Sequence, residues 1–193
     1  MAQTATTATR RAIWIGSLAD YNAGNLLGEW VDVDGKDADD LQAEADRILE
    51  TSREPYAEEF AIFDNEGFGG WVEEYTPLAD VAEFSAQIDA AVETVCEHAF
   101  IAWIRYHGKD DLPEEISDYA QRFYDQYAGH YSSAADFAQE FAEMTGSLES
   151  VPEDIAFYID WERYADHVLR DNGYHFEEAG SPEYGFYVFS PAD

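Results

Sequence analysis

Several short stretches of the sequence place carboxylates, a thiol and an imidazole where they could bind a metal ion or act in catalysis. Residues 32–37 read DVDGKD and resemble a calcium loop. An EF-hand requires glycine at its sixth position and a bidentate glutamate at its twelfth, whereas Gly35 is the fourth residue counted from Asp32. Cys96 and His98 lie two residues apart in a helical pattern, so their side chains point in different directions. We therefore predict no metal site and no Cys–His nucleophile.

Carboxylate pairs suited to glycoside hydrolysis are too numerous to indicate one site. Glutamates are adjacent at 73–74, 114–115 and 177–178, and a glycosidase needs two acids that flank a single bond. No serine stands in a G-x-S-x-G setting, and no phosphate-binding loop or dinucleotide fingerprint is present. The sequence thus predicts no catalytic residue, no cofactor and no enzymatic activity. A carboxylate-dependent hydrolase stays open as an alternative, which a concave pocket holding two acids of raised pKa would reveal.

The excess of acidic residues is the strongest feature of the chain. Among its 193 residues, 42 Asp and Glu face 10 Lys and Arg, which gives a net charge of −32. Such a charge repels nucleic acid and anionic lipid, so we expect a basic partner, no direct nucleic-acid binding and no membrane association. Because 46% of the residues are hydrophobic, the chain can still form a core. The single cysteine, Cys96, excludes an internal disulfide and favours a cytoplasmic protein.

Hydrophobic periodicity and turn residues predict an α+β fold. The first part reads as strands at 12–18, 28–33 and 60–63 with a helix at 37–50. A helical pattern follows from Pro77 to Gly108. The last part is expected to contain a strand at 123–127, helices at 133–144, 152–157 and 160–170, and strands at 174–176 and 186–189.

These elements suggest a chain of three small domains with small antiparallel sheets at both ends and helices in the middle. The predicted divisions are a flexible tail over 1–9, an N-terminal α+β domain over 10–76, a central helical domain over 77–120 and a C-terminal α+β domain over 121–193. Arg10 and Arg11 are expected at the edge of the tail, which would leave the folded body more acidic still.

The acidic residues are spread over every predicted element, and some are placed against helix stability. Asp40 with Glu44 and Asp46 with Glu50 are like-charge pairs at i,i+4, each costing a few tenths of a kcal/mol. A surface that imitates DNA phosphates would explain this, since two copies of net charge −32 match roughly thirty base pairs of duplex. The alternative is an acidic structural or adaptor protein of the halophile type, which would unfold at low salt.

Three stretches resemble the ArdA-type antirestriction proteins of mobile elements. They are 15–24 with 28–32, then 59–68, and finally 145–154 with 158–165, the last being similar to the segment often called the antirestriction motif. The matches fall in the correct order over residues 12–189. The chain departs from the family at Phe63, where His is common, and at Phe157, where Asn is common.

The resemblance implies an elongated, dimeric, three-domain α+β protein whose carboxylates are arranged like the phosphates of duplex DNA. The implied partner is the specificity and methyltransferase core of type I restriction-modification enzymes, where competition with DNA would block modification and restriction together. The carboxylates expected to stand in for phosphates are Asp37, Asp39, Asp40, Glu44, Asp46, Glu73, Glu74, Glu83, Asp89, Glu93, Glu114, Glu115, Asp118, Glu140 and Glu143.

The antirestriction-motif segment admits two interpretations, a contact with the target or a packed structural segment that also forms the homodimer contact. Pro152, Tyr158, Trp161 and Tyr164 are expected to be packed, which favours the structural one. The residues proposed for packing or for the dimer contact are Leu148, Val151, Pro152, Tyr158, Trp161 and Tyr164.

Overall fold

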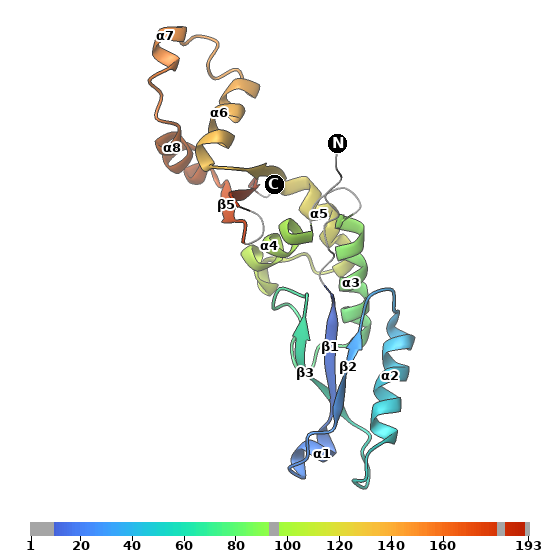
Figure 1. The fold of residues 1–193 in the computed structure, drawn as a ribbon. Coiled ribbons are helices and arrows are strands. Elements are labelled where there is room, and N and C mark those ends of the chain that lie inside the picture. Colours follow the sequence, from blue (N-terminus) through green and yellow to red (C-terminus); the bar gives the residue numbers. More distant parts are fainter. Residues whose placement is uncertain (1–9, 93–96, 181–183, 192–193) are drawn as a thin grey trace, which may run out of the picture. The chain divides into compact units, whose positions relative to one another are not determined.

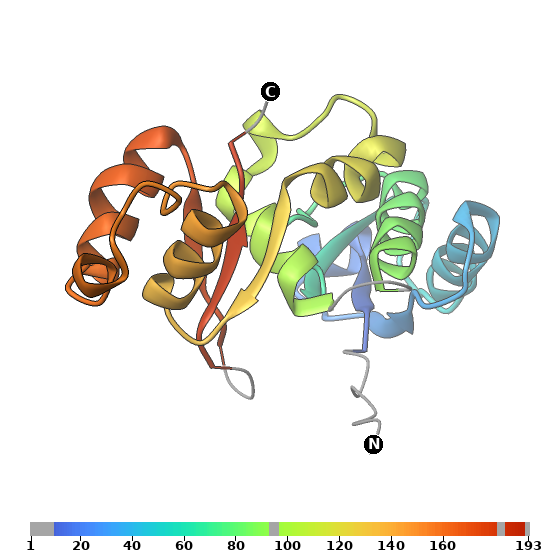
Figure 2. The same cartoon turned by 90° about the horizontal axis from the view of Figure 1, so that it is seen from above.

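The chain folds into two compact units, each combining a small antiparallel sheet with helices (Figures 1 and 2). The computed structural model describes residues 10–92, 97–180 and 184–191. One unit ends at Ala120 and the other begins at Gln121, where the sequence also suggests a boundary. The two three-stranded sheets with their helices confirm the predicted α+β class. The further division at residue 76 stays a prediction.

The sheet of the first unit has the strand order β2-β1-β3 and is antiparallel throughout. It consists of β1 (Ala12–Ser17), β2 (Gly28–Asp32) and β3 (Phe60–Glu66). The third strand is longer than predicted, because it continues past Phe63 to Glu66. Its register against β1 shifts between Trp14 and Ile15, so Phe63 is an extra residue in β3 and forms a β-bulge.

A short helix, α1 (Leu18–Asn22), begins directly where β1 ends. Leu18 was expected to end the strand, but the Ser17 side chain accepts a hydrogen bond from the Asp20 backbone N–H and caps the helix. The Asp20 side chain is itself buried and accepts a hydrogen bond from Ser52 Oγ at 2.6 Å. This bond joins α1 to the segment that follows the next helix.

Asp20 is expected to make the protein sensitive to acid. The hydrogen bond from Ser52, with that from Ser17, lowers the pKa of Asp20. A lowered pKa in the folded state means that the stabilisation is present above the unfolded value, about 3.9, and is lost as pH falls through the folded value. An Asp20→Asn variant should therefore be less stable than the parent at pH 7, and the difference should close below pH 4. Urea unfolding of both proteins from pH 7 to pH 3 checks this, and a constant difference would contradict it.

Helix α2 (Ala38–Glu50) runs alongside the first sheet (Figure 1). It confirms the helix predicted over 37–50, with Asp37 as the N-cap. Its buried residues Leu41, Ala45, Ile48 and Leu49 recur at helical spacing, and the β1 residues Ile13 and Ile15 are buried as well. The opposite face of α2 is left to polar and acidic side chains.

The remaining helices of the first unit enclose an aromatic core. They are α3 (Leu78–Val92) and α4 (Glu97–His107), with short 3-10 turns at Lys109–Asp111 and Ile116–Asp118. The helical pattern predicted over 77–108 thus contains two helices, and residues 93–96 between them lie outside the described residues. Trp71 stacks on Phe84 with ring centroids 4.3 Å apart, and Phe84 in turn lies 6.1 Å from Phe100.

The sheet of the second unit has the order β4-β6-β5, with β6 at its centre. Its strands are β4 (Tyr127–Tyr131), β5 (His175–Glu178) and β6 (Phe186–Phe189). The strand predicted at 123–127 is wrong, because α5 (Tyr119–Gln126) occupies most of that segment. Ala120, Phe123 and Gln126 are buried three residues apart, as in a helix, and this spacing prevails over the strand propensity of the aromatic residues.

Helices α6, α7 and α8 and two helical turns complete the described part of the second unit. Helix α6 (Ala134–Met144) begins at the predicted N-cap Ser133, and Figure 1 shows α7 (Glu153–Ala156) in the loop that joins α6 to α8 (Trp161–Tyr164). The helical run continues through a π-turn at Ala165–Leu169 and a 3-10 turn at Arg170–Asn172, which confirms the helix predicted at 160–170. The core of this unit contains Phe137, Ala138, Ala165, Leu169, Phe176 and Val188.

Candidate functional site

The carboxylates expected to imitate phosphates lie almost entirely on the surface. Glu93 lies outside the described residues, and Glu44 is half-buried. The remaining members of the set are exposed: Asp37, Asp39, Asp40, Asp46, Glu73, Glu74, Glu83, Asp89, Glu114, Glu115, Asp118, Glu140 and Glu143. They belong to α2, to the segment before α3, to α3 itself, to the 114–118 segment and to α6.

Some of the α2 carboxylates have a structural role. Asp37 Oδ1 accepts a hydrogen bond from the Asp40 N–H at 2.9 Å, and Asp40 Oδ2 accepts one from the Asp37 N–H at 3.4 Å. This reciprocal capping box satisfies two N–H groups at the start of the helix. Asp39 and Asp46 take no part in this capping box, although Asp46 accepts a hydrogen bond from Gln42 Nε2 at 2.8 Å.

Three of the predicted carboxylates are paired with cations. Glu44 accepts from Arg47 Nε at 2.9 Å, and Glu73 lies 2.9 Å from Lys109 Nζ. Arg47 also binds Glu29 on β2 at 2.8 Å, a bond that lowers the pKa of Glu29. The third, Asp89 on α3, is paired with Arg11. These pairs join elements of the first unit and lower the local negative charge at those positions.

Arg11 corrects the expectation that it belongs to the edge of the tail. It is 6% exposed and forms ion pairs with Asp34 and Asp89, while its Nη1 donates to the Ser85 carbonyl at 2.8 Å. Burial lowers the pKa of Arg11, but the bonds to Asp89 and Asp34 outweigh burial and leave that pKa above its ordinary value. Arg11 is therefore a charged, buried connection between β1 and α3.

The structure brings acidic residues from distant positions around one hollow of about 330 Å³. Glu83 of α3 lies there with Glu114 and Glu115, which the sequence analysis included, and with Asp80, which it did not. The sequence does not identify Asp80, because its position in the chain does not show which face of α3 contacts the 114–117 segment. The hollow concentrates negative charge on one face of the first unit.

The second unit has its own acidic positions on α6. Glu140 accepts a hydrogen bond from the Tyr131 hydroxyl at 3.0 Å, and Glu143 accepts one from Gln139 at 3.1 Å. Burial, together with the bond to Glu140, raises the pKa of Tyr131. Both carboxylates are exposed and stay available for an outside contact.

The antirestriction-motif segment is packed in part. Trp161 and Tyr164 are half-buried against the second core, with their rings 5.7 Å apart. Pro152 and Tyr158 were also expected to be packed, but Pro152 is exposed and Tyr158 is 81% exposed. They follow α6 on the α7 loop, which leaves them outside the core of their own chain.

Leu148 and Val151 of the same segment are half-buried. Exposed apolar side chains surround the short helix α7: Ile155, Phe157 and Tyr158, which we call the α7 patch. The sequence analysis identified Tyr158 but not Ile155 or Phe157 as a candidate contact.

The structure also bears on metal binding and on membrane-spanning helices. In the residues that the structure describes, no three His, Cys, Asp or Glu side chains are grouped so that they could hold a metal ion. No helix in the described part of the chain is long and apolar enough to cross a bilayer.

The sequence matches the model of a known protein family. The model of the antirestriction protein (ArdA) family matches residues 13–182, which include the first sheet except for Ala12 and the whole antirestriction-motif segment. A search of curated proteins found no match. Because the family model covers most of the sequence, the chain belongs to the ArdA family of antirestriction proteins.

Proposed function

We propose that this chain inhibits type I restriction-modification enzymes by occupying the DNA-binding groove of their specificity and methyltransferase core. Its carboxylates take the place of DNA phosphates, so that modification and restriction are blocked together. Membership of the ArdA family supports an antirestriction role and an inhibitor without enzymatic activity. The observation that carries the mimicry is the exposure of all the described candidate carboxylates except Glu44.

The electrostatics of the chain favour a basic groove as its target. A groove that binds DNA gains affinity by releasing counterions, and an acidic protein surface can use the same gain. With 42 acidic and 10 basic side chains, the internal ion pairs leave most of the negative charge uncompensated. The same charge repels nucleic acid, so the inhibitor does not bind the DNA that it displaces from the enzyme.

The direct test is competition for a labelled DNA duplex bound to a type I methyltransferase core. The protein should displace the duplex stoichiometrically at 50 mM salt, and its apparent affinity should fall about a thousandfold by 200 mM if six contacts form. Polyglutamate of matched charge is the control, and it should displace far less because its charges are not held in place. Absence of displacement at 50 mM salt would show that the target is wrong.

Other observations distinguish the proposed inhibitor from a halophile-type acidic protein and from a hydrolase. A halophile-type acidic protein would unfold at low salt, whereas the inhibitor should stay folded, with a cooperative unfolding transition at both 20 mM and 200 mM salt. A hydrolase needs a general acid that is shielded from water. The carboxylates Glu83, Glu114 and Glu115 around the acidic hollow are exposed, which favours an electrostatic role.

We also propose that the chain forms a homodimer through its C-terminal unit. Phe157 and Tyr158 of the α7 patch are 84% and 81% exposed, and their rings lie 5.4 Å apart. Contiguous exposed apolar groups mark interaction sites, and a two-fold axis would bury this patch against the same patch of a second copy. Leu148 and Val151, which are half-buried, would extend the contact.

Replacing Phe157 and Tyr158 together by aspartate should convert the dimer to a monomer at micromolar concentration. The expected reason is that four like charges would face one another across the two-fold axis. Sedimentation velocity measures the outcome. Tyr184→Asp, at another position 81% exposed in the same unit, should leave the dimer intact. If the parent protein is itself monomeric at that concentration and inhibits fully, the dimer has no part in the function.

A further inference from the structure

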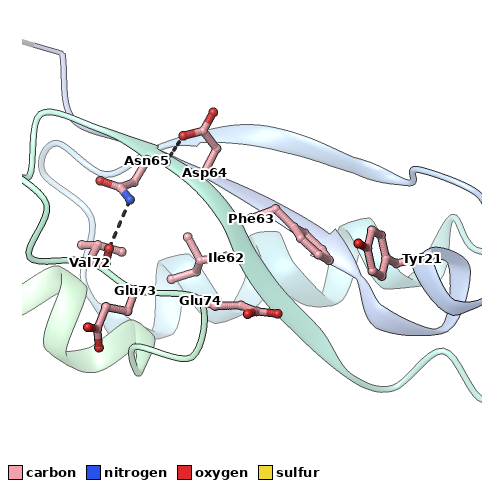
Figure 3. A pocket seen from close by; sticks show the side chains of 8 residues that line it. All are labelled: Tyr21, Ile62, Phe63, Asp64, Asn65, Val72, Glu73 and Glu74. Carbon is pink, nitrogen blue, oxygen red and sulfur yellow. Dashed lines mark hydrogen bonds between the residues drawn. The ribbon is translucent and has the colours of Figure 1, made fainter.

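An open pocket of about 330 Å³ lies beside β3 and shares no lining residue with the acidic hollow described above (Figure 3). Its lining includes the aromatic rings of Tyr21 and Phe63 and the carboxylates of Asp64 and Glu74. Ligand pockets typically have about 300–1,000 Å³, so this one suits a single side chain or another small group. Aromatic rings beside carboxylates in one small pocket favour a positively charged occupant that can stack on the rings.

The bulge in β3 sets the position of Phe63. Trp14 pairs with Asp64 and Ile15 pairs with Ile62, so Phe63 between them is not in register with β1. Bulges redirect side chains and are common beside functional sites. The Phe63 ring lies over Gly16, where a Cβ atom would overlap it, and its edge contact with Trp14 has a centroid separation of 5.6 Å. The contacts with Gly16 and Trp14 thus fix the position of the Phe63 ring.

Tyr21 forms the other aromatic wall and is the part that a partner can reach. It projects from α1, is 55% exposed, and lies 5.0 Å from Phe63 between ring centroids at an interplanar angle of 41°. Figure 3 shows its ring beside that of Phe63. A large aromatic side chain that stays half exposed next to a pocket offers a face for stacking.

The charge of the pocket is only partly compensated. Glu73 is paired with Lys109, and Figure 3 shows its side chain pointing away from the two rings. Glu74 extends toward Phe63 in the same view. Within the part of the chain that the structure describes, neither Glu74 nor Asp64 has an ion-pair partner. The Asn65 side chain donates to the Val72 carbonyl at 3.2 Å and ties β3 to the segment that carries Glu74.

We propose that this pocket binds an arginine side chain of the DNA-binding partner. A guanidinium group is planar, stacks on aromatic faces and donates five hydrogen bonds, whereas lysine offers only a compact charge. The guanidinium lies against Tyr21 and donates to the carboxylate of Glu74, whereas the Asp64 side chain points away from the two rings (Figure 3). This inference rests on the proposed function, which supplies the partner, and it adds one localised contact to an otherwise diffuse charge attraction.

Binding of arginine can be tested without any restriction enzyme. The blocked tripeptides Gly-Arg-Gly and Gly-Lys-Gly are titrated at 150 mM salt while the tyrosine ring signals are followed by NMR. The arginine peptide should shift Tyr21 saturably and bind roughly fivefold more tightly than the lysine peptide, with Tyr184 as the exposed reference. Tyr21→Ala should abolish the preference and Tyr21→Phe should keep it. Equal binding of both peptides, or equal shifts of Tyr21 and Tyr184, would overturn the proposal.

The second measurement is displacement of DNA from the type I methyltransferase core. Tyr21→Ala should weaken displacement roughly fivefold and Tyr184→Ala should not. Glu74→Gln should weaken it more than Glu178→Gln, which makes the same charge change at an exposed position of β5. Parental displacement by Tyr21→Ala would refute the pocket and leave the proposed function intact. A parent protein that binds the arginine peptide but displaces no DNA would refute the proposed function and leave the pocket as an arginine site for another basic partner.

Discussion

Changing Asp39, Asp46 and Glu50 together to lysine should weaken displacement of DNA about a hundredfold at low salt. These carboxylates are exposed on α2, belong to no capping box and form no ion pair within the described residues. Each reversal removes one phosphate-like contact and adds repulsion from the basic groove. The dependence of affinity on salt should also become weaker, by about three in its logarithmic slope. Competition titrations at 50, 100 and 200 mM salt measure both quantities.

The single variant Asp39→Asn is the matched control for this block. Exposed charges contribute little individually, typically less than about 1 kcal/mol, so one neutralisation should change the affinity less than about fivefold. Thermal unfolding shows whether each variant is still folded. Loss of all inhibition in a folded Asp39→Asn protein would contradict a collective mechanism, and so would an unaffected triple variant.

Replacing Arg11 by methionine should destabilise the protein by about 3 kcal/mol. The substitution keeps much of the buried volume but leaves Asp34 and Asp89 without their cation and the Ser85 carbonyl without its donor. Ser85 and Asp89 belong to α3, and Asp34 lies in the turn that follows β2, so the substitution weakens the attachment of the start of β1 to both. Urea unfolding at pH 7 and constant salt gives the change in free energy.

Arg10 provides the comparison at the neighbouring position. Its guanidinium is paired with Asp32, and both side chains are more than half exposed. Solvent screens such a pair, so Arg10→Met should leave the free energy of unfolding unchanged within error. Equal effects of the two substitutions would mean that burial of Arg11 does not matter.

Three basic residues of the first unit have the same structural role. Arg11, Arg47 and Lys109 each connect elements that are separate in sequence. They stabilise a chain whose own charge opposes compaction. Their carboxylate partners remain at least partly exposed, so stabilisation does not require the acidic surface to be covered.

Much of the fold follows from the sequence because local patterns are strong there. In α2, apolar residues at helical spacing and an aspartate before the first turn determine the helix and its start. The strand predicted at 123–127 is wrong for the opposite reason, since aromatic residues favour strands by propensity while burial at Ala120, Phe123 and Gln126 requires a helix. Strand propensity depends on neighbouring residues, whereas the core with which Phe123 packs contains residues that are distant in sequence.

The family, the α+β class and the acidic character of the protein can be predicted from residue types, their order and their short-range spacing. Which charges meet depends on the three-dimensional fold. It buried Arg11 between Asp34 and Asp89, gathered Asp80 with Glu114 and Glu115, and placed Tyr21 beside a bulged Phe63. Tyr158, by contrast, was left exposed. These relations depend on strand register, helix rotation and the path of loops, which couple residues far apart in the chain and leave no periodic signal in it.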